Sequence, residues 1–181
     1  MKQFADLVIK LGTSTKTNEK LGALSEYFSI ANDKDKVWVI AIFSGRRPKR
    51  AVNSTQLWTW CNELAKLPDW LFEECYHAVG DLGETIALLL PETTIADASY
   101  PLHYYLETLI SIEKEDESVR KEFILRSWQT MTQAERFVFN KLITGNFRIG
   151  VSQNTMVNAL SKTSKRSQKQ KINPLKLLKS G

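Results

Sequence analysis

The segment KLITGNFRIGVS, residues 141–152, carries residue types that could bind a phosphate group. Gly145 can end one helix in the left-handed conformation that side chains disfavour, and Ser152 can cap the start of the next. The first amides of that second helix, together with the guanidinium of Arg148, would form an anion site that Lys141 is placed to reach. Gly150 would let the backbone approach another molecule closely. The alternative is a structural corner between two helices, in which Arg148 covers the edge of the core.

A second cationic segment, SGRRPKR, lies at residues 44–50 and contains Arg46, Arg47, Lys49 and Arg50. The net charge of +5 is unevenly distributed, because residues 136–181 hold 10 basic and no acidic side chains. The first 135 residues hold 15 basic and 20 acidic side chains. Such separation indicates a polyanionic partner, either nucleic acid or an anionic membrane surface. The alternative is a solvated loop with a solubilising basic tail.

The elements that must hold these segments in place read as helices along the chain. Residues 2–11 repeat their apolar positions with the 3.6-residue period of a helix face. Asn53 with Gln56, and Thr132 with Glu135, have the spacing of a capping box before further apolar periodic runs. These signals place helix starts at both pairs.

The apolar run KVWVIAIF, residues 36–43, could form either a buried strand or a buried helix. No other run has the pattern of a partner strand, so we expect a helix. The sequence therefore predicts an all-α fold, a single compact multi-helix domain of about ten helices over residues 1–162. Residues 163–181 are basic, lack an apolar face until Leu175 and contain Pro174, so we expect them to form a flexible tail.

No constellation of residues typical of a catalytic or metal site is visible. Cys75 and His77 are two residues apart, which on a helix points them to different faces. The carboxylates of Asp69, Glu73 and Glu74 fit a solvated helix face. With two histidines and two cysteines in the chain, a structural zinc site is disfavoured. We therefore expect no catalytic residues and no metal site.

The remaining composition is that of a globular protein of the cytoplasm. Cys61 and Cys75 are expected to be buried free thiols. The longest apolar stretches are too short to cross a bilayer, and no signal peptide is visible, so we expect no membrane association. No heptad seam is present, which favours a monomer. Core packing is favoured over base stacking for the five tryptophans, which fall on apolar helical faces: Trp38, Trp58, Trp60, Trp70 and Trp128.

Four segments, in order along the chain, resemble the DNA-binding domain of ATP-dependent DNA ligases, in particular its bacterial branch. KLITGNFRIGVSQNTMVNAL is similar to that family's late Gly-x-x-Arg-Ile/Leu-Gly turn, which joins two helices and contacts duplex backbone. TSTKTNEKLGALSEYF resembles its early Thr-Lys-rich turn, and IAIFSGRRPKR resembles its basic loop. WLFEECYHAVGDLGETIALLLP resembles the segment with its Gly-Asp-Leu-Gly turn. The resemblance covers about residues 1–161.

This resemblance implies an all-helical domain that lies along the minor groove of double-stranded, nicked DNA and helps later domains encircle it. Carried over by position, it implies phosphate contacts in the early turn and in the late turn: Thr15, Lys16, Thr17, Gly145, Asn146, Arg148, Gly150 and Ser152. The basic loop would add electrostatic contacts. Asp81 of the Gly-Asp-Leu-Gly turn would repel phosphate, so we interpret it as an N-cap at a helix junction.

The chain also departs from a complete ligase. No lysine is followed by x-Asp-Gly, the motif whose lysine takes AMP from ATP in that family. ATP and Mg²⁺ would be cofactors of a full-length ligase, and its adenylation and oligonucleotide-binding-fold domains would be partners of this chain. We therefore expect a non-catalytic domain that positions a nick for sealing in repair or replication. A helical adaptor that binds an acidic protein surface is the alternative.

Overall fold

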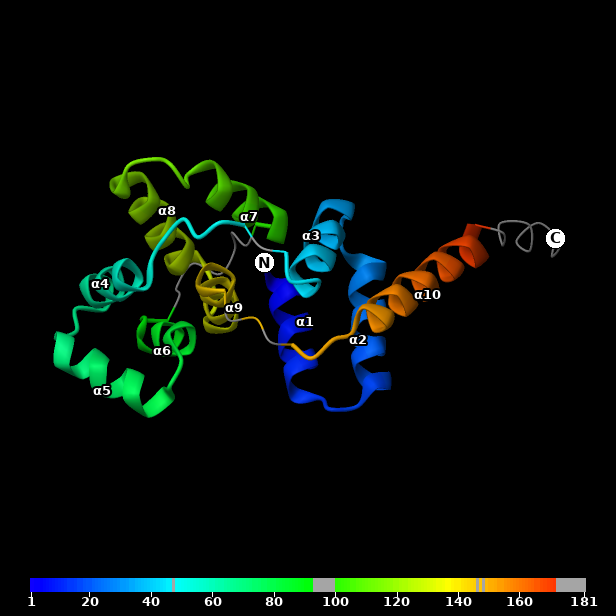
Figure 1. Cartoon of the computed structure of the whole chain (residues 1–181), viewed down its shortest axis with the longest axis horizontal. Helices are drawn as coiled ribbons and strands as arrows, with labels where there is room; N and C mark the ends of the chain where they lie inside the picture. The colour runs from blue at the N-terminus through cyan, green and yellow to red at the C-terminus, as the bar shows by residue number, and fades with distance from the viewer. Residues whose placement is uncertain (47, 93–99, 146, 148, 172–181) are drawn as a thin grey trace, which may run out of the picture.

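The computed structural model describes residues 1–46, 48–92, 100–145, 147 and 149–171, with residues 164–171 described by their backbone alone. Over these residues the chain forms ten helices and no strand (Figure 1). Their bounds are α1 Lys2–Thr13, α2 Thr17–Ile30, α3 Asp33–Phe43, α4 Ser54–Ala65, α5 Asp69–Val79, α6 Leu82–Leu89, α7 Leu102–Ser111, α8 Glu117–Thr130, α9 Gln133–Thr144 and α10 Gln153–Lys171. The predicted all-α class is confirmed, and α3 shows that KVWVIAIF is helical.

The helices form two neighbouring groups (Figure 1). The first contains α1, α2, α3 and α10, and the second contains the helices from α4 to α9. Contacts of α1 with α9 and of α3 with α7 join the groups. Because α10 packs against α2, the segment between α9 and α10 crosses from one group to the other.

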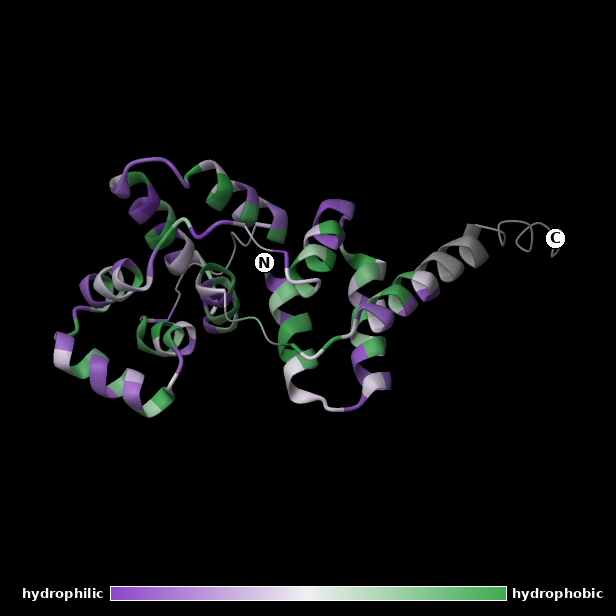
Figure 2. Ribbon diagram, viewed as in Figure 1, coloured by the Kyte–Doolittle hydropathy of each residue, from purple (hydrophilic) through white to green (hydrophobic). Residues whose placement is uncertain are grey.

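One hydrophobic core runs through both groups. Figure 2 shows apolar residues on the facing sides of the helices, and the largest fully buried side chains include Trp60, Trp128, Phe28 and Phe139. The prediction of core packing is wrong for Trp70, whose side chain is 65% exposed. The reason is that α5 lies at the edge of the second group and buries only Phe72.

Local signals in the sequence set most helix ends. Asn53 with Gln56, and Thr132 with Glu135, form the two predicted capping boxes. Substitution of such an N-cap residue by alanine typically costs about 1 kcal/mol. Gly145 ends α9 with φ 81°, in the left-handed region where glycine is favoured, as predicted. These caps fix where the segments of interest leave the helices.

The last helix extends further than the predicted domain boundary. The backbone of residues 163–171 continues α10, although we expected these residues to belong to the tail. They contain neither glycine nor proline. Lysine, glutamine and arginine are good helix formers, and the positive charges of lysine and arginine suit a helix C-terminus. Residues 172–181, with Pro174 and Leu175, lie outside the described residues.

Candidate nucleic-acid interface

We call residues 14–17 the early turn, residues 44–50 the basic loop and residues 145–152 the late turn. The basic loop is fastened to the end of α9, where the late turn begins. Nη2 of Arg50 donates a hydrogen bond of 2.6 Å to the carbonyl oxygen of Thr144. The last carbonyls of a helix lack intrahelical partners and carry partial negative charge, so a guanidinium there is stabilising. This contact, between residues 94 positions apart, places the basic loop beside the late turn.

The late turn is fastened at its other end to α2. Nζ of Lys20 donates a hydrogen bond of 3.1 Å to the carbonyl oxygen of Gly150. A Cβ atom on Gly150 would lie 3.2 Å from that Nζ, and φ at this glycine is +25°. The close approach that we expected here to another molecule is therefore made in part by Lys20 of the same chain. Thr155 N donates to Oγ of Ser152 at 3.2 Å, which confirms the predicted cap of α10.

The early turn presents an exposed, cationic helix start. The N-cap of α2 is Lys16, whose backbone is extended. No side chain caps the first amides of α2, so these donors stay available to an anion. Lys16 and Glu19 pair at 3.1 Å with side-chain exposures of 77% and 54%. An exposed pair of this kind contributes little and is easily exchanged for a phosphate.

The carboxylate of Glu19, in the first turn of α2, contacts Ser14 and Lys16 of the early turn. A hydrogen bond of 2.5 Å from Ser14 to Glu19, and the contact with Lys16, lower the pKa of the Glu19 carboxyl, Ser14 being the larger cause. Glu19 is therefore ionised at neutral pH. It offsets part of the charge of Lys16 until a stronger anion competes for it.

The basic loop starts from a tight exit of α3. Gly45 has φ 81°, and the backbone N–H of Arg46 donates to the carbonyl oxygen of Ala41 at 2.9 Å. The side chains of Arg46 and Lys49 are exposed, and Lys49 lies 3.8 Å from Glu113 in a loose ion pair. Two cationic side chains are therefore available to a ligand on this loop.

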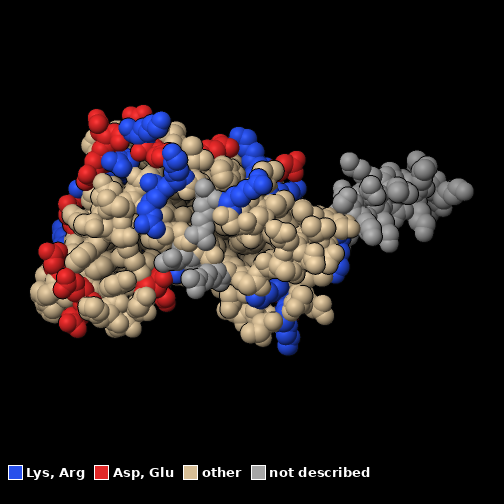
Figure 3. Space-filling model, in the orientation of Figure 1, with Lys and Arg blue, Asp and Glu red and all other residues tan. Residues whose placement is uncertain are grey.

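The base of this loop shares a small cavity with the late turn. The cavity, of about 230 Å³, is lined by Ile42, Phe43, Phe147 and Ile149 among others. Figure 3 shows Lys and Arg side chains beside the join of the two helix groups, whereas Asp and Glu gather toward the edge formed by the second group. The basic loop and the late turn thus meet beside the join, whereas the early turn lies at the end of α1 and α2 (Figure 1).

Lys141 differs from the other predicted contacts. It forms an ion pair with Asp81 in which the two side chains are only 17% and 21% exposed, and its ammonium lies 5.5 Å from the centre of the Phe137 ring. A cation paired in a mostly buried position would have to leave its partner to reach a phosphate. This pairing argues against the direct phosphate contact that we expected of Lys141.

The Gly-Asp-Leu-Gly turn acts as a helix junction. Asp81 is the N-cap of α6 and accepts a hydrogen bond of 3.0 Å from the backbone N–H of Glu84. A Cβ atom on Gly83 would lie 3.3 Å from Cβ of Asn140, whose Nδ2 donates to the Gly83 carbonyl oxygen. The N-cap interpretation of Asp81 is confirmed, and the absence of a side chain at Gly83 brings α6 close to α9.

Three predicted site residues, Arg47, Asn146 and Arg148, lie outside the described residues, and their roles stay predictions. Lys20, whose ammonium donates a hydrogen bond to the late turn, was not among the predicted site residues. It follows Lys16 by four positions, the spacing that places two residues on the same helix face, so the sequence contained a signal for it.

Nothing among the described residues has the arrangement of a catalytic or metal centre. No group of three or more His, Cys, Asp or Glu side chains in this part of the chain could hold a metal ion. Burial raises the pKa of the Cys61 thiol to about 12, which makes it a poor nucleophile at neutral pH. In the same residues, no helix has the length and apolar character to cross a membrane.

The described residues define a class of protein by fold alone, an all-helical domain whose surface carries cationic turns. Comparison with protein families makes this specific, because the family model for the DNA ligase N terminus matches residues 1–161. The chain belongs to this DNA ligase N-terminal family, which confirms the resemblance read from the four segments. A search of curated proteins gave no match.

Proposed function

We propose that this chain is the duplex-DNA-binding domain of an ATP-dependent DNA ligase, and that it grips the phosphate backbone along the minor groove of nicked DNA. In this role it positions the nick for the adenylation and oligonucleotide-binding-fold domains, which use ATP and Mg²⁺. Membership of the DNA ligase N-terminal family supports the ligase context. The observation that carries the proposal is the pair of hydrogen bonds from Lys20 to Gly150 and from Arg50 to Thr144. Together they fasten the late turn to α2 and place the basic loop beside the late turn, which supports a shared phosphate-binding surface.

The proposed contacts are cationic side chains, hydroxyls and backbone amides. In the described residues they come from the early turn, the basic loop and the late turn, together with α2: Thr15, Lys16, Thr17, Lys20, Arg46, Lys49, Arg50, Gly145, Gly150 and Ser152. The sequence adds Arg47, Asn146 and Arg148. Groups of this kind bind phosphate and sugar, and such contacts position a duplex without reading its bases. We therefore expect binding that is independent of sequence.

A titration by fluorescence anisotropy tests this proposal. Labelled nicked duplex, intact duplex and single strand would be titrated with the protein at several salt concentrations. If about five to eight phosphates are neutralised, log K should fall against log salt with a slope of about −4.5 to −7. Binding that is weak, that shows no preference for duplex, or that hardly depends on salt would refute the proposal and favour the adaptor alternative.

The proposal also makes a prediction about adenylation of this chain. This chain contains no Lys-x-Asp-Gly sequence, so we expect it to form no covalent adenylate when incubated with labelled ATP and Mg²⁺. A labelled protein band after denaturing electrophoresis would show that the chain has an activity which this proposal does not include.

A further inference from the structure

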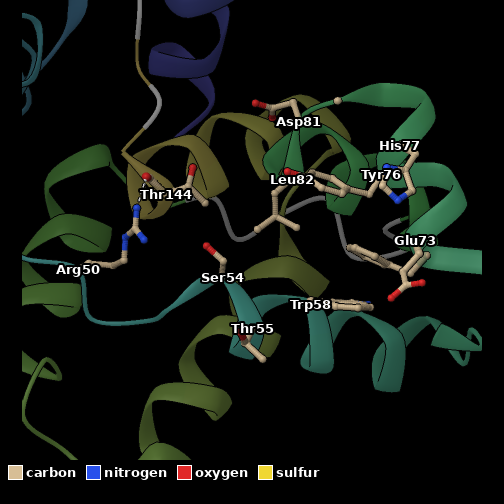
Figure 4. Close-up of a pocket in the computed structure, with 12 residues that line it drawn as sticks. Arg50, Ser54, Thr55, Trp58, Glu73, Tyr76, His77, Asp81, Leu82 and Thr144 are labelled. Atoms are coloured by element: carbon tan, nitrogen blue, oxygen red, sulfur yellow. Dashed lines mark hydrogen bonds between the residues drawn. The ribbon is translucent and has the colours of Figure 1, made fainter. Parts of the chain in front are cut away.

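A pocket of about 490 Å³ lies between α4, α5, α6 and the end of α9, beside the proposed interface (Figure 4). Arg50 and Thr144, whose hydrogen bond fastens the basic loop, belong to its lining. Its volume lies within the usual range for small-molecule sites, about 300–1,000 Å³. No role proposed above explains this pocket.

One wall of the pocket is aromatic. Trp58 stacks on Phe72 with ring centroids 5.5 Å apart and an interplanar angle of 24°, so the pair forms a flat, supported surface. Tyr76 of α5 also lines the pocket and is 41% exposed. Every nucleobase has a π-face that can stack on aromatic side chains, which makes this wall suited to a planar ring.

The two ends of the pocket carry opposite charges. Figure 4 shows Arg50, Ser54 and Thr144 on one side, and Glu73 on the other side with Trp58 and Tyr76. Ser54 is the first residue of α4, so its end of the pocket combines the guanidinium with the positive end of a helix dipole.

The end of the pocket opposite Arg50 carries the carboxylate of Glu73, which can accept a hydrogen bond. The carboxylate of Glu73 is exposed and makes no hydrogen bond or ion pair with any other described residue. The side chain of His77 lines the pocket beside it. A ligand that fits both ends has an anionic group, a flat ring and a hydrogen-bond donor on the far edge of that ring.

We propose that this pocket binds a single nucleotide, with its phosphate at Arg50 and Ser54, its base against Trp58 and Tyr76, and an amino group of the base donating to Glu73. The nucleotide could be free in solution or an unpaired nucleotide of bound DNA. Only the second source rests on the proposed function. Adenine, cytosine and guanine carry exocyclic amino groups that can donate to a carboxylate. Thymine offers only its N3–H, which lies between two carbonyl oxygens that a carboxylate repels.

The first experiment follows the indole N–H signal of Trp58 by NMR during titration with dAMP, dGMP, dCMP and dTMP. The signal is assigned by its loss in Trp58→Phe. We expect the three amino-bearing nucleotides to shift this signal and to bind about fivefold more tightly than dTMP, the scale of one charge-assisted hydrogen bond at an exposed site. Equal affinities for all four nucleotides would overturn the role of Glu73.

Two matched variants on α5 distinguish a direct contact of Glu73 with the base from a general effect of removing one negative charge. Glu73→Gln should abolish the discrimination against dTMP. Glu74→Gln, on the same helix but outside the pocket lining, should leave it unchanged. Trp58→Ala should weaken binding of all four nucleotides by about 5- to 150-fold, the effect of losing one stacking aromatic. Because Trp58 packs on Phe72, unfolding of that variant is checked by circular dichroism, and the Glu73 pair tests the proposal independently.

The second experiment separates the two sources of the nucleotide. Intact protein is titrated with a fully paired duplex and with the same duplex carrying one unpaired dA. If DNA supplies the nucleotide, the unpaired dA should raise affinity, and Glu73→Gln should remove this gain while leaving affinity for the paired duplex unchanged. Lys16→Ala should do the reverse, weakening paired duplex without affecting dAMP. A lack of response both to the mononucleotides and to the unpaired dA would overturn the inference while leaving duplex binding intact.

Discussion

Lys20 offers a direct test of how the proposed DNA-binding surface is assembled, because its ammonium joins α2 to the late turn. Lys20→Met removes the charge and the hydrogen bond to Gly150, while the apolar stem of the side chain is kept. The hydrogen bond is 3.1 Å long and lies at an exposed position, so its loss should cost only about 0.5–1 kcal/mol of folding stability. A larger loss is expected in DNA binding.

The expected loss of binding has two parts. The ammonium of Lys20 is bonded to a carbonyl oxygen and has no carboxylate partner among the described residues, so its full charge is available to a nearby phosphate. Its removal also releases the late turn from α2. Together these effects should cost about 1–2 kcal/mol of duplex binding, about 5- to 30-fold in Kd. The slope of log K against log salt should become shallower by about 1.

The assay is the anisotropy titration with nicked duplex over a series of salt concentrations, accompanied by thermal unfolding of each variant. Lys34→Met is the matched control, because Lys34 lies at the opposite end of α3 from the basic loop and pairs with Glu107. We expect it to bind DNA like the unmodified chain. If Lys20→Met binds within twofold of that chain and keeps its salt slope, the surface is not assembled through this lysine.

Three further predictions concern neighbouring contacts. Arg50→Gln should lower stability by about 1 kcal/mol and weaken duplex binding about tenfold, because the carbonyl of Thr144 loses a charged donor; an unchanged Kd would contradict this. Asp81→Asn keeps an N-cap but leaves the ammonium of Lys141 unpaired, so urea unfolding should show a loss of about 2 kcal/mol, and no loss would show that the pair contributes nothing. Burial raises the pKa of the Cys61 thiol from 9.0 to about 12, so the folded chain holds this proton above pH 9 while the unfolded chain releases it. The free energy of unfolding should therefore fall between pH 9 and pH 12, by about 1.4 kcal/mol per pH unit from this group. Cys61→Ala should reduce this pH dependence, as measured by urea unfolding.

The sequence predicted those features that depend on neighbours along the chain. The capping boxes at Asn53 and Thr132 and the glycine at the end of α9 are local devices, and each appears where its spacing places it. The helical state of residues 36–43 followed from the lack of a partner strand. Such signals need only a few residues of context, and this is why the fold class could be predicted.

Contacts between residues that are far apart in the sequence could not be predicted from it. The hydrogen bond from Lys20 to Gly150 joins positions 130 residues apart, and the ion pair of Lys141 with Asp81 spans 60. No periodicity encodes which helices meet. Trp70 shows the same limit, because an apolar helix face is buried only if another element covers it.

The order of the helices along the chain has a consequence for folding during synthesis. Since α10 packs against α2, the two ends of the matched region must meet before the late turn has its support. The helices that precede α10 are synthesised first, and they can begin to pack while α10 is still inside the ribosome. Long sequence separation slows this kind of closure. A nascent chain should therefore form most of its hydrophobic core first, and the late turn should gain its support from α2 and α10 last.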